Sequence, residues 1–191
     1  MQSLTDIISR SVDVLLEGGT LLYPTDTIWG VGCDATNAAA VEKIYALKQR
    51  DHSKSMLILC ADLAMVEQYV AAVDKQIACL LEGAGRATTV IMPIQHPGLA
   101  PNLQASDGTI GVRIPHMDFC LKLLRQFGRP IVSTSANLSG QPSPSAYSDI
   151  NDALKTMVDY AIPPEYGNVS GGKASRIVKI NCAGTLTVLR G

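Results

Sequence analysis

The segment 133–140, with the sequence STSANLSG, gathers hydroxyl and amide groups directly after the apolar run 130–132. The apolar run predicts a buried strand, so these small donors and acceptors would lie together where the strand ends. Hydroxyls, an amide and a flexible glycine suit the recognition of an oxygen-rich anion such as a phosphate. Taken alone, the segment could equally be an ordinary turn rich in Ser, Asn and Gly.

Three further segments place polar residues beside predicted strands. The strand-like run 21–23 leads into 24–32 (PTDTIWGVG), where a proline would end the strand and two glycines allow close backbone approach. Lys48, Gln49, Arg50 and Lys54 come just before the strand-like run 56–60. Arg113 lies inside the alternating apolar run 109–115, an unusual place for a charge without a partner.

Helical and extended patterns alternate along the chain. Amphipathic or capped segments predict helices over 4–17, after Asn37, and over 62–70, 74–81, 118–127 and 149–157. Strands are expected over 88–94 and 131–134, and as a final pair over 175–180 and 185–189, turned at 183–184. This alternation favours an α/β fold, in which a twisted, open, mixed sheet is flanked by helices.

Composition limits the class of protein. The chain has 191 residues, of which 47% are hydrophobic, and a net charge of −1, which indicates one globular domain over 1–191. No targeting or membrane-spanning segment is evident, so a cytoplasmic location is expected. The five cysteines are scattered without metal-ligand spacing, which favours buried free thiols. The three histidines, His52, His96 and His116, are interpreted as surface residues.

Taken together, these motifs resemble the Sua5/YrdC/YciO family, and most closely its single-domain YrdC-type members, the threonylcarbamoyl-AMP synthases. The matching stretches are 24–32, 48–50, 112–115, 135–140 with 142–144, and Leu189-Arg190. The resemblance implies a YrdC-like fold with a concave ligand-binding face, without the additional C-terminal module of the longer Sua5-type relatives. It also implies formation of threonylcarbamoyl-AMP and pyrophosphate from L-threonine, bicarbonate and ATP with Mg²⁺. Partner transferase proteins would then place the threonylcarbamoyl group on tRNA (t6A).

The resemblance carries roles onto individual residues. Thr27, Arg113 and Ser133 are implied to bind threonine. Arg50, Lys54, Ser135, Asn137, Ser143 and Arg190 are implied to bind ATP, and Lys48 and Arg50 to be catalytic. No protein ligand is implied for the metal. Two alternatives remain open: Arg113 could be exposed on an edge strand, and Lys48 and Arg50 could complement a helix C-terminus.

Two segments depart from the family pattern. Relatives commonly carry Trp-Pro-Gly-Pro-x-Thr where this chain has 83–88 (GAGRAT), which keeps only Gly85 and Thr88. A late Ser-Thr-Ile element appears as Ser175-Arg176-Ile177. Arg176 replaces a substrate-facing threonine, so it would either alter the amino-acid contacts or point away.

Two other functions on the same fold remain alternatives. One is a YciO-like paralogue with weak or different activity. The other is a non-enzymatic RNA-binding or ribosome-maturation factor, for which the net charge and the scarcity of aromatic residues are unfavourable. Weak RNA binding through a local basic groove is also open.

Overall fold

The computed structural model describes residues 2–52, 56–83, 85–167, 172–180 and 185–191. Within these residues, nine strands form one sheet in the order β7-β1-β2-β6-β3-β5-β4-β8-β9. The strands are β1 (Leu21–Tyr23), β2 (Gly30–Gly32), β3 (Leu57–Leu59), β4 (Thr88–Pro93), β5 (Thr109–Arg113), β6 (Ile131–Ser135), β7 (Tyr160–Ala161), β8 (Arg176–Ile180) and β9 (Leu186–Arg190). Pairing is parallel for β7–β1, β3–β5 and β4–β8 and antiparallel elsewhere, so the expected mixed sheet is confirmed.

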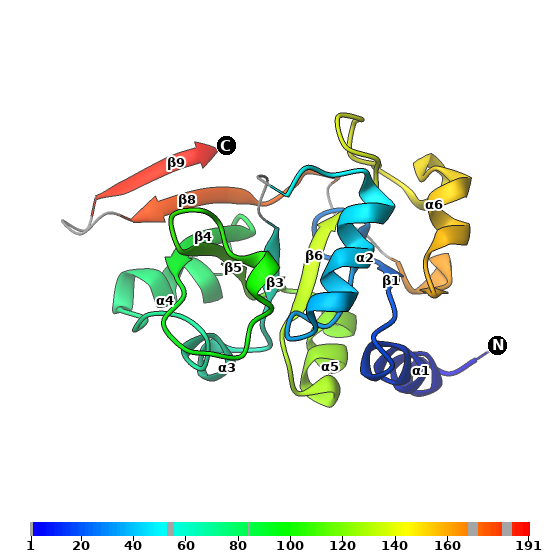
Figure 1. The fold of residues 1–191 in the computed structure, drawn as a ribbon, viewed down its shortest axis with the longest axis horizontal. Helices are drawn as coiled ribbons and strands as arrows, with labels where there is room; N and C mark the ends of the chain where they lie inside the picture. The colour runs from blue at the N-terminus through cyan, green and yellow to red at the C-terminus, as the bar shows by residue number, and fades with distance from the viewer. Residues whose placement is uncertain (1, 53–55, 84, 168–171, 181–184) are drawn as a thin grey trace.

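The helices are α1 (Leu4–Leu16), α2 (Ala38–Lys48), α3 (Leu63–Glu67), α4 (Lys75–Glu82), α5 (Asp118–Phe127) and α6 (Asp152–Met157). α1 and α5 pack against each other, and α4 packs against β4. Figure 1 shows β8 and β9 at one end of the molecule and α1 and α6 at the other. Helices therefore flank an open sheet, as expected from the alternation of patterns.

Local signals fix the ends of the two helices that matter for the site and its sheet. Asn37 caps α2 by accepting hydrogen bonds from the N–H groups of Ala39 and Ala40. α5 ends at Gly128, which takes the left-handed conformation with φ of 73°. Both ends agree with the sequence prediction.

Other boundaries differ from the prediction. The last helix was expected over 149–157, but α6 begins at Asp152 after Asn151 caps it, and a 3-10 turn (Tyr147–Asp149) precedes it. The predicted final pair is present as β8 and β9, while its turn at 183–184 lies outside the described residues.

The expected loop after Pro24 contains a strand that the sequence prediction missed. β2 pairs with β1 on one side and with β6 on the other. A Cβ at Gly32 would lie 2.0 Å from the carbonyl oxygen of Val132, so only glycine permits this approach. Two of the three residues of β2 are glycines, which have low strand propensity, and this explains the miss.

The cysteines are free in the described residues, and Cys33, Cys60 and Cys120 are buried as expected. Burial raises the pKa of the Cys120 thiol to about 12, so this thiol is unreactive. Cys79 is exposed, because it lies on the outer surface of α4, and here the expectation of burial is wrong. Cys182 lies outside the described residues. Across the described ranges, no helix combines the length and apolarity needed to cross a bilayer.

Candidate functional site

A cavity of about 850 Å³, with its open mouth included, lies across one face of the sheet. In β5, Gly111 and Arg113 line it, whereas Val112 between them belongs to the hydrophobic core. Side chains alternate between the two faces of a strand, so the strand period selects which residues meet the cavity. The predicted site residues that line it are Thr27, Arg50, Arg113, Ser133, Ser135, Ser143 and Arg190.

Glycine keeps the floor of the cavity open. A Cβ at Gly111 would lie 3.0 Å from Cγ2 of Thr89 and 3.1 Å from Cβ of Leu57. Both contacts are tighter than van der Waals packing allows without displacement. The central strand therefore leaves room for a ligand where a larger residue would fill the cavity.

Arg113 is buried and paired. β5 lies between β3 and β4, so the alternative of an exposed edge-strand arginine is wrong. Its Nη2 donates to the Asp26 carboxylate, and its Nη1 donates to Thr27 Oγ1 at 2.9 Å. Its Nε is buried and has no partner among the described residues. The unusual charge in the apolar run thus has the partner that the sequence analysis required.

The hydrogen-bond direction at Thr27 follows from its neighbour. Thr25 Oγ1 donates to the carbonyl oxygen of Ile28 at 2.7 Å, so its only proton is used. In the 2.9 Å contact between the two hydroxyls, Thr27 must therefore be the donor. Because Thr27 also accepts from Arg113, it has one lone pair left and can meet a ligand only as an acceptor.

Lys48 lies behind the site. It is the last residue of α2, and it is 1% exposed. Its Nζ donates to the main-chain carbonyls of Ser135 and Asn137, the latter at 2.6 Å, and its own carbonyl accepts from the N–H of Ser139. Burial, and then the charge of Arg50, lower the pKa of Lys48 to about 8. Lys48 is absent from the cavity lining, so its catalytic role stays a prediction, and its contacts favour a role in positioning the end of β6 and the loop after it.

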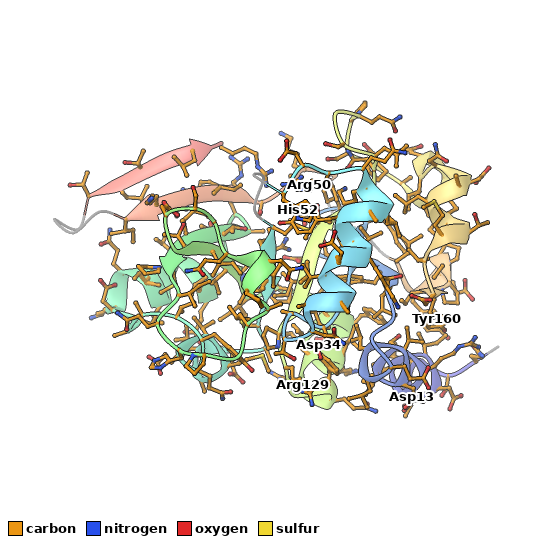
Figure 2. All side chains as sticks on the ribbon, viewed as in Figure 1. Asp13, Asp34, Arg50, His52, Arg129 and Tyr160 are labelled. Carbon is orange, nitrogen blue, oxygen red and sulfur yellow. The ribbon has the colours of Figure 1, made fainter. Side chains whose placement is uncertain are left out.

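Arg50 and the hydroxyls of Ser135 and Ser143 line the cavity together. Figure 2 shows Arg50 just beyond the C-terminal end of α2, next to His52. Burial lowers the pKa of Arg50, which still remains a cation at neutral pH. Lys54 lies outside the described residues, so its predicted contact with ATP stays a prediction.

The side chain of Asn137 is absent from the cavity lining. Its Nδ2 donates to the carbonyls of Leu138 and Gln141, at 2.9 and 2.6 Å, which folds the loop on itself. Its Oδ1 is buried and has no partner among the described residues. In the described part of the chain, this oxygen is a buried acceptor without a partner close in sequence to Ser135.

Arg190 reaches the cavity from β9. Its Nε and Nη2 donate to the carbonyl oxygen of Ser175, at 3.1 and 2.8 Å. Burial, and then the charges of Arg113 and Arg86, lower its pKa. The edge strand therefore aims a cation into the site, as the match to the closing Leu-Arg element predicts.

Sequence reasoning missed part of the wall. Thr89 and Ser175, which both line the cavity, share a hydrogen bond of 2.8 Å between their hydroxyls. The pair joins β4 to the segment before β8, and nothing in the local sequence of either residue signals the contact. Thr25 lies in the 24–32 motif without a predicted role of its own, although its hydroxyl determines whether Thr27 donates or accepts toward a ligand. Apolar lining residues, which carry no chemical signal in sequence, are Ile28, Met56, Leu57, Ile91 and Ile177.

One departure from the family pattern, Arg176, lies away from the cavity. Ser175 and Ile177 line it, but Arg176 between them does not, and its Nη2 donates to Thr88 Oγ1 at 3.3 Å. The strand period thus turns Arg176 to the other face, so of the two possibilities it points away.

All three histidines are exposed, as expected. Over the described ranges, no cluster of three or more His, Cys, Asp or Glu residues could hold a metal ion.

The Sua5/YciO/YrdC family model, described as "Telomere recombination", matches residues 13–191. The chain belongs to the Sua5/YciO/YrdC family. A curated relative, the threonylcarbamoyl-AMP synthase of Stenotrophomonas maltophilia, is 35% identical over 173 residues, which cover 89% of this chain and 91% of the relative.

Solved structures of the Sua5/YciO/YrdC family have the same fold. The chain superposes on P. abyssi Sua5 complexed with L-threonine with a TM-score of 0.88 at 23% identity, and it covers 55% of that protein's length. It superposes on E. coli YciO with a TM-score of 0.83 at 26% identity, covering 90% of that chain. The family model and the curated relative confirm the expected family, and the solved structures confirm the twisted open α/β architecture.

Proposed function

We propose that this chain is an L-threonylcarbamoyladenylate synthase. It would convert L-threonine, bicarbonate and ATP into threonylcarbamoyl-AMP, pyrophosphate and water. The observation that carries the proposal is the single cavity in which Thr27, Arg113 and Ser133 meet Arg50 and Arg190. Residues suited to an amino acid and residues suited to a polyphosphate thus line the same cavity, as a reaction that joins an amino-acid derivative to ATP requires. Relatives named threonylcarbamoyl-AMP synthase support the same reaction.

The Arg113 subsite, defined here as Thr27, Arg113 and Ser133, would bind threonine. The planar guanidinium retains unused N–H groups that match a planar carboxylate. Thr27 can only accept from the ligand, so it would accept a hydrogen bond from the amino-acid nitrogen or hydroxyl. Arg113 would fix the carboxylate of threonine, and the accepting hydroxyl of Thr27 would fix its nitrogen or hydroxyl. Together they would orient the carbamate on the threonine nitrogen toward the nucleotide.

Arg50 and Arg190, with the hydroxyls of Ser135 and Ser143, would bind the phosphates of ATP. Charge-assisted hydrogen bonds from guanidinium to phosphate are among the strong polar contacts in proteins. The side-chain oxygens on this side are neutral, and the buried Oδ1 of Asn137 lacks a partner among the described residues. Such a donor set fits Mg²⁺ that keeps its phosphate and water ligands; Ser135, which lines the cavity, would hold that hydrated ion, and Asn137 would join it only if its side chain turned toward the cavity. Mg²⁺ would supply charge neutralisation on the phosphates.

In the proposed reaction, bicarbonate first adds to the threonine nitrogen with loss of water, giving a carbamate. A carbamate oxygen then forms a bond to the α-phosphorus of ATP, and the bond from that phosphorus to the pyrophosphate oxygen breaks. This makes the enzyme a nucleotidyltransferase and needs no covalent enzyme intermediate. Arg50 would stabilise the charge that moves onto the phosphates, while Lys48 holds the end of β6, which carries Ser135.

The product would supply partner transferases that modify tRNA, and the cytoplasm is the proposed compartment because ATP, threonine and tRNA occur together there. Weak RNA binding stays a minor alternative. Trp29 and Tyr23 are buried, so they offer no stacking surface for bases.

Pyrophosphate release is the experiment that tests this function. We expect release from ATP only when threonine and bicarbonate are both present, since their adduct is the nucleophile. Equal release after rigorous removal of carbon dioxide would indicate an aminoacyl-adenylate former and contradict the proposal. Threonine binding without any release would favour the YciO-like alternative.

A further inference from the structure

Asp26 influences the cavity without lining it. Its carboxylate pairs with the guanidinium of Arg113, and the two side chains are 10% and 4% exposed. Its neighbours Thr25 and Thr27 both line the cavity, whereas Asp26 is absent from the lining. Any ligand at Arg113 therefore meets a buried ion pair in place of an isolated cation.

The arginines of the cavity differ in their partners. Arg113 faces a carboxylate, whereas Arg190 donates to neutral oxygens of Ser175. Arg190 thus keeps its full charge, while Asp26 cancels much of the field of Arg113. One cavity thereby contains a nearly neutral anion subsite and a strongly positive one.

This difference discriminates between anions by their charge. Attraction to a positive site grows in proportion to the ligand charge, whereas the cost of removing the ligand from water grows roughly with the square of the charge. A weak field can therefore compensate the desolvation of a monoanionic carboxylate but not that of a phosphoryl group carrying about two charges. A stronger field would favour the phosphoryl group more than the carboxylate.

We propose that Asp26 is a specificity-determining residue that reserves the Arg113 subsite for a monoanionic carboxylate and excludes phosphoryl groups from it. The inference deepens the proposed function and relies on it for the identity of the carboxylate as that of threonine. Exclusion of this kind keeps a polyphosphate from occupying both subsites, and so it is specificity by disfavouring the wrong ligand.

Asp26→Asn tests the charge, because asparagine keeps the shape and the acceptor oxygen for Arg113. Isothermal titration with inorganic pyrophosphate would compare this variant with the parent. We expect the variant to gain a pyrophosphate site, at least tenfold tighter than any corresponding binding by the parent and displaced by L-threonine. Asp34→Asn is the matched control, since Asp34 is a buried carboxylate paired with Arg129 at 3.0 Å and lies outside the cavity lining. The control should bind pyrophosphate as the parent does.

Unchanged pyrophosphate binding in a folded Asp26→Asn protein would overturn the proposal. If the variant does not fold, the parent protein still tests it with the threonine analogue that carries a phosphonate in place of the carboxylate. We expect the dianionic phosphonate to bind at least tenfold more weakly than threonine, and the gap to narrow as the phosphonate becomes monoanionic at lower pH. Equal affinity throughout would contradict the proposal. A parent that binds no threonine would count against the proposed function, while the gain of the pyrophosphate site would still report on Asp26.

Discussion

The ammonium of Lys48 holds the main chain at Asn137, to whose carbonyl oxygen it donates at 2.6 Å. With a second bond to Ser135 and a return bond from Ser139, α2 and the loop after β6 are connected at three points. The position of the Ser135 hydroxyl in the cavity therefore depends on a charge that never faces the ligand.

Lys48→Met should reduce kcat/KM for ATP about 10- to 100-fold, because the loop loses its buried donor and Ser135 shifts. The KM for threonine should change less. Lys43→Met is the matched control, since Lys43 also lies on α2 and donates to a main-chain carbonyl, that of Gly18, at 2.8 Å. Parental steady-state kinetics in Lys48→Met would contradict the prediction that Lys48 positions Ser135.

The depressed pKa of Lys48 should appear in the pH dependence of stability. The folded protein holds this pKa at about 8, below the ordinary value of 10.5. Between these values the unfolded chain binds more protons, so the free energy of unfolding contributed by Lys48 rises with pH. Urea unfolding from pH 7 to 10.5 should show the difference between parent and Lys48→Met growing by about 3 kcal/mol. Cysteine and tyrosine titrations cancel in this difference, and a flat difference would contradict the expectation.

Arg50→Ala should lower kcat by roughly 30- to several hundred-fold, because a charge-assisted contact that strengthens in the transition state is worth about 2 to 4 kcal/mol. Single-turnover pyrophosphate release is the measurement. Arg50→Lys, which keeps the charge but loses the planar fork, should fall between alanine and the parent. Parental rates in the alanine variant would leave Arg50 only a role at the helix end.

The two groups of the cavity should separate in kinetics. Thr27→Val removes the acceptor and leaves Nη1 of Arg113 without its 2.9 Å partner, so the KM for threonine should rise about 5- to 30-fold. Ser135→Ala should act mainly on the KM for ATP. The assignment fails if calorimetry shows normal threonine binding by Thr27→Val.

Arg190→Ala should lower the stability of the ligand-free protein by no more than about 1 kcal/mol, because its bonds to Ser175 lie at a partly exposed edge. The rise in melting temperature with added ATP should be largely lost, since the binding contribution to stability disappears. Lys179→Ala removes an exposed ion pair on β8 and serves as the control. A parental ATP-dependent shift in Arg190→Ala would show that this arginine does not contact ATP.

Particular residues show how far the sequence predicts this site. The apolar alternation around Arg113 required a partner for its charge, but the choice of Asp26 depends on how the β1–β2 connection folds over β5. The helical period predicts that Lys48 lies in the last turn of α2. The direction of its side chain, however, is set by main-chain carbonyls that are 87 and 89 residues further along the sequence. The bond between Thr89 and Ser175 spans 86 residues. Local sequence patterns do not predict which residues meet across such sequence separations. These contacts are therefore seen only in the structure.

The order of the strands has a consequence for biosynthesis. Thr27 is made early, whereas β9, which carries Arg190, pairs at an edge of the sheet and is made after the other described strands. A nascent chain can therefore form its hydrophobic core around β1, β2, β6, β3 and β5, with Arg50, Ser135 and Ser143 already made, before β9 adds Arg190 to the cavity. β9 pairs with β8, and β8 joins the sheet by pairing Arg176 with Thr88 of β4; contacts of such long sequence separation form slowly. Full protection from proteolysis by ATP should accordingly arise later in translation or refolding than the secondary structure, and an intermediate that lacks β9 should bind the nucleotide more weakly than the full chain.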